Sequence, residues 1–547
     1  MSTLMTQHWQ PRRLFSDGWA AIRFMGHLRG FLRSEPSPDD WAAGIRGQLE
    51  SRGESFLSVL ENAVHGNPSS PYRALMRWAG VEYRDVKELV RRDGLDEALS
   101  RLYEAGVRLS LEEFKSRQPI RRSGFVLDTQ SSDFDNPLIT RHFEATTGGS
   151  RSRGTRLIVD LDLVAYEAAH AYFSLVALDA VDRPTALWRP VPPGVTGIKV
   201  ALQRARFDRI PERWFSQTPV GWDRHRWRHS SFTSGAIMAS RIWGKPLPAP
   251  EHIPLDQADR VAGWMNEQVR AEAPALLDTN VASAIRVCQA ARGRDLDIAG
   301  SLFRTGGEPL TDSRAAFIES TGSRVVVNYG IAEAGRLGMA CGDPVAVDDV
   351  HLFLDKVAVL QQPKALGSAG PQVPALYVTT LHPASPKLML NVEIGDYGQL
   401  LDRSCGCPFG ELGLTRHLHT IRSYEKLTSE GMHFLGADLI GALESVLPSR
   451  FGGDPTDYQL VEEDVDGLPR VRVVVSPRVG EVDEKALVEV LLQALGRPDG
   501  GRQMMADWWR QGAVLGVVRR EPYATGAAKI HPLHLRQQQA RSDTDEN

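Results

Sequence analysis

The chain has 547 residues, a formal net charge of −4 and 42% hydrophobic residues, an ordinary composition for a globular protein. This length allows about two to four domains. The slightly acidic balance excludes a general attraction to polyanions, so any nucleic-acid contact would have to be local. The N-terminus MSTLMTQHWQPRR has no apolar signal segment, no window approaches a membrane span, and only four cysteines are present. We therefore expect a cytoplasmic protein without a disulfide framework.

Helical spacing dominates the first 120 residues. Apolar residues recur at three- and four-residue intervals in 41–64 and 85–106, and NPSSPY (67–72) breaks the pattern. We predict that residues 1–120 form a helical N-terminal part of a large domain.

The pattern changes after this point to short apolar runs between helical segments. The runs are RLIVDLDLVAY (156–166), TGIKVAL (196–202), SRVVVNYG (323–330), PALYVTTL (374–381) and KLMLNVEIGDYG (387–398). Such alternation indicates an α/β fold with a mixed or parallel sheet, and we predict this core over 121–423. Residues 357–381 further indicate two strands joined by a Gly/Pro loop.

A smaller unit is predicted over residues 424–535. It contains a helix at 436–448, a hairpin at 457–475 that turns at Asp466–Gly467, and a second helix at 483–496. The polar residues 536–547 are predicted to be disordered. The fold class expected is therefore α/β, with a large multi-part N-terminal domain and a small α+β C-terminal domain.

The stretch ATTGGSRSRGTR (145–156) is rich in glycines, hydroxyl side chains and arginines. Gly149 and Gly154 have the GxxxxG spacing of a Walker phosphate loop, but Thr155 and Arg156 follow where that loop needs Lys and then Ser or Thr. Backbone N–H groups in such a glycine-rich loop can still converge on an anion. The residues alone leave two interpretations open, a phosphate-binding loop and a plain flexible loop.

Four later motifs occur in order after this loop: GGEPL (306–310), VVVNYGIAE (325–333), EIGDYG (393–398) and REPYATGAAKIHPLHL (520–535). Together the five segments resemble the adenylate-forming enzymes, the superfamily of acyl-CoA synthetases and adenylation domains. The helical N-terminus with SPYRALMRWAG, and CGCPFGELG near residue 405, resemble the phenylacetate–CoA ligase and CapK-like branch.

The resemblance implies an AMP-forming ligase that activates a carboxylic acid with ATP and then transfers the acyl group to coenzyme A. The acid could be an aryl or arylacetic acid. The implied nucleotide-binding residues are Thr146, Thr147, Gly148, Gly149, Ser150, Gly307, Glu308, Pro309, Asn328, Tyr329, Gly330 and Asp396.

Three charged residues have implied catalytic roles. Glu333 would hold Mg²⁺, Arg422 would reach the ribose, and Lys529 would bridge the substrate carboxylate and the α-phosphate. Lys529 would be delivered by a mobile small domain with its hinge near Glu425 and Lys426. The alternatives are structural: a helix-start carboxylate for Glu333, a strand-end turn for Asp396, and surface cations for the other two.

The sequence also departs from the family's pattern. Arg151 and Arg153 replace the usual loop residues, and Ala527–Ala528 precede the lysine where Ser-Gly is usual. Two alternatives therefore stay open: transfer to a carrier-protein thiol or an amine, and a nucleotide-binding homologue without turnover. The basic, aromatic segment GWDRHRWRHSSF (221–232) is weak evidence for nucleic acid, and we expect neither nucleic acid nor membrane as a partner. A homodimer is a further expectation.

Three of the four cysteines fall near one another in this scheme. Cys341, Cys405 and Cys407, with His351, would form a Cys₃His set suited to tetrahedral zinc. Four protein ligands leave no open position, so the ion would be structural. The alternative is a group of buried thiols, which is also the interpretation for Cys288.

Overall fold

A computed structural model of the chain describes residues 26–139, 143–146, 156–191, 194–218, 227–365, 372–424, 428–429, 432–433, 436–465, 468–495, 515–525 and 528–536. Several predictions fall outside these residues: positions 1–25 of the helical part, the loop residues 147–155, positions 221–226 of the basic segment, the hinge near Glu425 and Lys426, the turn at Asp466–Gly467, and the tail from 537 onward. None of the described helices is long and apolar enough to cross a membrane.

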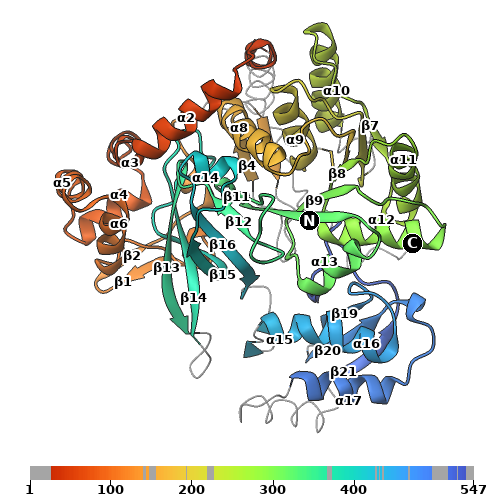
Figure 1. Cartoon of the computed structure of the whole chain (residues 1–547). Helices are drawn as coiled ribbons and strands as arrows, with labels where there is room; N and C mark the ends of the chain where they lie inside the picture. The colour runs from red at the N-terminus through yellow and green to blue at the C-terminus, as the bar shows by residue number, and fades with distance from the viewer. Residues whose placement is uncertain are drawn as a thin grey trace, which may run out of the picture.

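The N-terminal part is a helical layer at the left of Figure 1. After helical residues 26–33 come α2 (Pro38–Glu50), α3 (Arg52–Val59), a π-helical turn (Leu60–His65), α4 (Pro71–Trp78), α5 (Tyr83–Asp93), α6 (Leu95–Glu104) and α7 (Leu111–Phe114). Ser37 and Asp40 form a capping box that begins α2. Gly94, at φ 87°, allows the sharp change of direction between α5 and α6. A ribbon of β1 (Ile120–Arg122) and β2 (Phe125–Leu127) follows.

A mixed sheet of twelve strands runs through the centre of the described chain, in the order β13-β14-β15-β16-β12-β11-β10-β9-β8-β5-β6-β7. Its strands are β5 (Thr185–Trp188), β6 (Arg213–Ser216), β7 (Pro250–His252), β8 (Leu276–Asp278), β9 (Leu302–Gly306), β10 (Arg324–Ile331), β11 (Gly335–Met339), β12 (Val350–Leu352), β13 (Val357–Ala365), β14 (Gln372–Thr380), β15 (Val392–Asp402) and β16 (Arg416–Ser423). The pairs from β7 to β10 are parallel, and the pairs from β10 to β13 are antiparallel.

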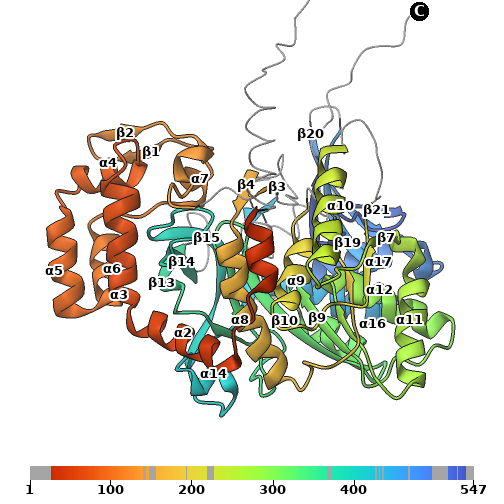
Figure 2. The ribbon, with the colours of Figure 1, turned by 90° about the horizontal axis from the view of Figure 1, so that it is seen from above.

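Helices cover both faces of the parallel part (Figure 2). They are α8 (Leu161–Ala177), α9 (Thr196–Ala205), α10 (Trp227–Ile242), α11 (Ala258–Arg270), α12 (Val281–Gly293) and α13 (Asp312–Glu319), with α14 (Pro408–Glu411) near α8. Side chains alternate between faces along a strand. Leu302 therefore packs in a cluster with Leu175 of α8, whereas the next residue, Phe303, packs in the cluster that contains α12. Burial on both faces explains why these strands are continuous apolar runs.

One of the predicted apolar runs was assigned to the wrong element. TGIKVAL (196–202) lies within helix α9 and not in a strand. The run is short enough to suit either structure, and the buried Ile198, Ala201 and Leu202 fit one helical face. By contrast, RLIVDLDLVAY divides into strand β4 (Arg156–Val159) and helix α8, which Asp160 caps by accepting from the Asp162 N–H.

A second sheet forms the smaller C-terminal unit, at the lower right of Figure 1. Its order is β21-β20-β19-β22, with β19 (Tyr458–Val465), β20 (Leu468–Val475), β21 (Leu515–Arg519) and β22 (Leu533–Arg536). α15 (Gly436–Gly441), α16 (Leu447–Phe451) and α17 (Glu484–Leu495) belong to this unit, which has its own apolar core. The α/β class with a smaller sheet-containing C-terminal unit is thus confirmed, and β19 and β20 pair antiparallel as expected for the hairpin.

Candidate active site

A pocket lies at the carboxyl ends of β9 and β10, beside β15 and β16. It is lined by Gly307, Glu308, Pro309, Leu310, Val327, Asn328, Tyr329, Gly330, Asp348, Asp396, Ile421, Arg422 and Ser423. In open α/β sheets, ligands bind at this edge of the parallel strands. The structure therefore brings together eight of the residues predicted from three separate motifs and from Arg422.

Two carboxylates of the pocket are oriented by neighbouring side chains. The Tyr329 hydroxyl donates to Asp396 Oδ2 at 2.9 Å, which joins β10 to β15. Arg422 Nη1 donates to Asp348 Oδ2 at 2.8 Å, and Asp348 also accepts from the Thr420 and Ile421 N–H groups. Burial, with Asp396 next to it, raises the pKa of Tyr329, so its hydroxyl stays a donor.

Asp348 was not identified from the sequence. It lies in the stretch VDDV, where nothing in the spacing separates it from a surface turn. In the structure it is 3% exposed and holds Arg422 in the pocket. Its role depends on the contact between the segment before β12 and the end of β16, which only the fold reveals.

Lys529 comes from the C-terminal unit and reaches the turn after β9. Gly307 has φ 82°, and an added Cβ there would lie 2.6 Å from Lys529 Nζ. A side chain at Gly307 would therefore displace the ammonium group as well as strain the backbone. The motif residues around 307 and the lysine, more than 200 positions apart, meet at one edge of the pocket.

Glu308 connects the segment that contains Lys529 to the large domain through hydrogen bonds. Its Oε1 accepts from the Ile530 N–H at 2.7 Å, and its Oε2 accepts from the Ala282 N–H at 3.0 Å. The side chain is 6% exposed, so both backbone donors depend on it. Glu308 also lines the pocket, so its predicted contact with the nucleotide stays a prediction beside this bond to the residue next to Lys529.

The remaining predicted residues have different outcomes. Glu333 lies in the turn between β10 and β11, outside the residues that line the pocket, and its carbonyl accepts from the Lys387 N–H. Thr146 ends β3 (Phe143–Thr146), whose partner β4 places Arg156 opposite it. The loop between them thus begins and ends on adjacent strands. The roles of Glu333 and of the loop stay predictions.

A second cluster, which shares no residue with the pocket lining, lies between β11, β12 and α14. The ligand atoms of Cys341, His351, Cys405 and Cys407 all lie within 4.8 Å of one another. His351 Nε2 is 3.4 Å from Cys405 Sγ and 3.2 Å from Cys407 Sγ, and the sulfurs of Cys341 and Cys405 are 3.9 Å apart. His351 Nδ1 donates to the Leu414 carbonyl at 2.7 Å, which leaves Nε2 as the acceptor that faces the thiols.

These distances suit a tetrahedral zinc ion. With Zn–S near 2.3 Å and Zn–N near 2.0 Å, a tetrahedron has S···S edges of about 3.8 Å and S···N edges of about 3.5 Å. The fixed histidine tautomer is also the arrangement that zinc-binding histidines adopt. Hydrogen bonding from Cys341 lowers the pKa of the Cys407 thiol. The four predicted ligands are therefore brought together, and their donor set fits the ion.

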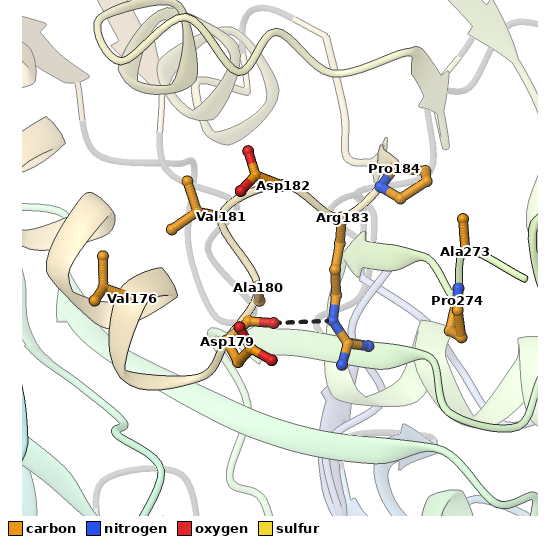
Figure 3. A pocket seen from close by; sticks show the side chains of 9 residues that line it. All are labelled: Val176, Asp179, Ala180, Val181, Asp182, Arg183, Pro184, Ala273 and Pro274. Atoms are coloured by element: carbon orange, nitrogen blue, oxygen red, sulfur yellow. Dashed lines mark hydrogen bonds between the residues drawn. The ribbon is translucent and has the colours of Figure 1, made fainter.

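A further hollow lies at the C-terminal end of α8 (Figure 3). It is lined by Val176, Asp179, Ala180, Val181, Asp182, Arg183, Pro184, Ala273 and Pro274. Its one arginine already donates to the Asp179 and Gly300 carbonyls. The charged group of this hollow is therefore already hydrogen-bonded to backbone oxygens, and we assign the hollow no function.

Comparisons with known proteins identify no matching family profile and no curated sequence relative. The fold is similar to that of 2-hydroxyisobutyryl-CoA ligase in the postadenylation state with 2-HIB-AMP, at TM-score 0.49 and 14% identity, over 92% of this chain and 90% of that one. Acetoacetyl-CoA synthetase from Streptomyces lividans gives TM-score 0.40 and 13% identity over 72% and 55% of the chains. McyG A-PCP with phenylalanyl-adenylate gives TM-score 0.41 and 10% identity over 71% and 64%. At these identities the likeness concerns the fold alone.

Proposed function

We propose that the protein uses ATP to activate a carboxylic acid as an acyl-adenylate and then transfers the acyl group to coenzyme A. The observation that carries this proposal is the convergence at one pocket of Tyr329, Asp396 and Arg422, together with the ammonium group of Lys529. Tyr329 offers an aromatic ring, Asp396 offers an acceptor for ribose hydroxyls, and Arg422 offers a cation. Lys529 adds a point charge where a carboxylate and a phosphate would meet.

In the first step, a carboxylate oxygen of the acid would attack the α-phosphorus of ATP, and the bond to pyrophosphate would break. In the second step, the coenzyme A sulfur would attack the acyl carbon and AMP would leave. All reacting groups of the first step are anionic, so positioning and charge neutralisation supply the catalysis. Lys529 would neutralise the oxygens at the reacting centre. Glu333 would hold Mg²⁺ on the phosphates of ATP.

The test is a screen of carboxylic acids with ATP and Mg²⁺, with coenzyme A present or absent, and with AMP and thioester measured. We expect thioester and AMP to form in equal amounts with at least one acid. Acid-dependent hydroxamate formation with hydroxylamine, but no thioester, would contradict the coenzyme A step and favour a carrier-protein thiol or an amine. An arylacetic acid such as phenylacetate is the first acid to test.

We further propose that the cluster of Cys341, His351, Cys405 and Cys407 holds one structural zinc ion. The distances between its ligand atoms match the edges of a zinc tetrahedron, which supports this assignment. The ion would join the end of β11 and β12 to the turn before α14. No coordination position would remain for a substrate.

Ala528 offers a test of the lysine segment that uses stability alone. It is a non-glycine residue at φ 63°, next to Lys529, and its N–H donates to the Thr525 carbonyl. We expect Ala528→Gly to raise the free energy of unfolding by about 0.5–1 kcal/mol, since relief of left-handed strain exceeds the added entropy of the unfolded chain. Urea denaturation measures this change. A loss of stability would show that Ala528 packs favourably enough to outweigh its strain.

A further inference from the structure

A group of buried and partly buried cations lies between the sheet and helices α8 and α9, and we call this group the cationic cluster. Its members are Arg189, Lys199, Arg204, Arg304, Arg336 and Lys356. Arg304 and Lys356 are fully buried, Arg204 is 1% exposed and Arg189 is 6% exposed. Lys199 and Arg336 are partly exposed. None of these residues has a role in the mechanism proposed above.

Two carboxylates lie inside the cluster. Asp278 accepts from Arg189 Nε and from Arg304 Nε, each at 2.7 Å. Glu167 accepts from Lys199 Nζ at 2.5 Å and from Lys356 Nζ at 2.7 Å. Burial alone would raise the pKa of both carboxyls, but these cations hold it well below the usual range. Both carboxylates are therefore ionised.

The positive charges still exceed the negative ones. The six cations of the cluster surround only these two carboxylates. A third buried carboxylate, Asp355, is already paired with His170 and accepts from the Tyr166 hydroxyl. Even with Asp355 included, three positive charges have no carboxylate counterpart among these described residues. An uncompensated buried charge costs several kcal/mol, so an excess of this size calls for a further anion.

Four guanidinium nitrogens of the cluster are available as donors to such an anion. Among the described residues, no hydrogen-bond partner is found for Arg304 Nη1 and Nη2, Arg204 Nη1 or Arg336 Nη1, all of which are buried. Burial, with Arg304 nearby, lowers the pKa of Arg204 to about 9 and that of Arg336 to about 10, so both remain charged near neutral pH. Forked guanidinium donors fit the oxygens of a carboxylate, phosphate or sulfonate.

The cluster and one residue of the pocket lining, Asn328, lie on the same face of the sheet. Arg304 precedes Gly306 by two residues on β9, so the two positions share a face about 7 Å apart. Asn328, which lines the pocket, pairs in register with Gly306, and its buried Oδ1 also has no partner among the described residues. A molecule that occupies the pocket could therefore extend along this face toward Arg304.

We propose that the cationic cluster binds a second anionic group of the acid substrate, so that the substrate class is an acid with a distal carboxylate, phosphate or sulfonate. This inference rests on the proposed function. The reacting carboxylate would lie at the pocket near Lys529, and the distal anion would accept from Arg304, Arg204 and Arg336. A free inorganic anion has the same chemistry, and the experiment separates the two sources.

The experiment uses matched acids with the full-length chain. Adipate is compared with hexanoate, and 4-carboxyphenylacetate with phenylacetate, in ATP–pyrophosphate exchange. Thermal unfolding is measured with each acid and with sulfate, without ATP. Arg336→Gln tests the cluster, because Arg336 is partly exposed and its replacement leaves the Asp278 and Glu167 ion pairs intact. Arg260→Gln, at an exposed arginine paired with Glu251, is the matched control.

We expect the doubly charged acid of at least one pair to have a kcat/KM about 10- to 100-fold above its partner. Arg336→Gln should remove this preference, and Arg260→Gln should retain it. Equal or better use of both singly charged acids would overturn the inference, as would a thermal shift by sulfate that equals the shift by the diacids. If no acid supports exchange, the proposed function fails. The inference then stands on a diacid-specific thermal shift that Arg336→Gln abolishes, and falls without one.

Discussion

Replacing Lys529 with alanine is expected to lower acid-dependent ATP–pyrophosphate exchange by at least about 100-fold. The ammonium group lies against Gly307, one of the residues that line the pocket. The backbone contact from Ile530 to Glu308 does not involve this side chain, so the segment stays in place. The loss should therefore be in kcat, with the chain folded.

The control is Lys485→Ala, at an exposed lysine of α17 in the same unit. It should exchange pyrophosphate as the unaltered chain does. Thermal unfolding of both variants checks that neither has lost its fold. Exchange retained by Lys529→Ala would remove this residue from the mechanism, and would return it to the surface cation that the sequence alone also allowed.

Zinc removal is the second large effect that we expect. The purified chain should contain about one zinc ion, and Cys407→Ser should lose it together with about 3 kcal/mol or more of unfolding free energy. Two structural reasons support this magnitude. The four ligands join separate segments of the large domain, and Cys341 and Cys407 belong to one apolar cluster that also contains residues of α2 and α8.

Cys288→Ala provides the matched control, because Cys288 is buried in α12 away from the four ligands. This variant should keep its zinc. Elemental analysis of both proteins, purified without chelators, gives the metal content, and denaturation gives the stability. Absence of zinc from the unaltered chain would contradict the assignment and leave a cluster of three thiols and one imidazole without a metal, in which Cys405 is partly exposed.

The parts of the site that were predictable are those whose chemistry is local. Gly307, Tyr329 and Asp396 stand in short motifs where glycine, aromatic and acidic residues have fixed spacing, and all three line the pocket. Cys405 and Cys407 were recognisable because thiols at close spacing are rare in a chain with four cysteines.

Residues whose role depends on distant segments were not predictable. Asp348 acquires its function from backbone N–H groups more than 70 positions away. The members of the cationic cluster lie on α9, β9 and β11, directly after β5 and directly before β13, so no window of the sequence contains its charge excess. TGIKVAL was assigned to a strand because a short apolar run does not distinguish a buried strand from a buried helix.

The proposed function depends most directly on acid-dependent exchange of labelled pyrophosphate into ATP. A panel of singly and doubly charged carboxylic acids, tested with Mg²⁺ and without coenzyme A, isolates the first step from the choice of acceptor. We predict exchange with at least one acid, strictly dependent on that acid and lost in Lys529→Ala. No exchange with any acid, from a folded chain that still binds ATP, would contradict acid activation and identify a nucleotide-binding protein without turnover.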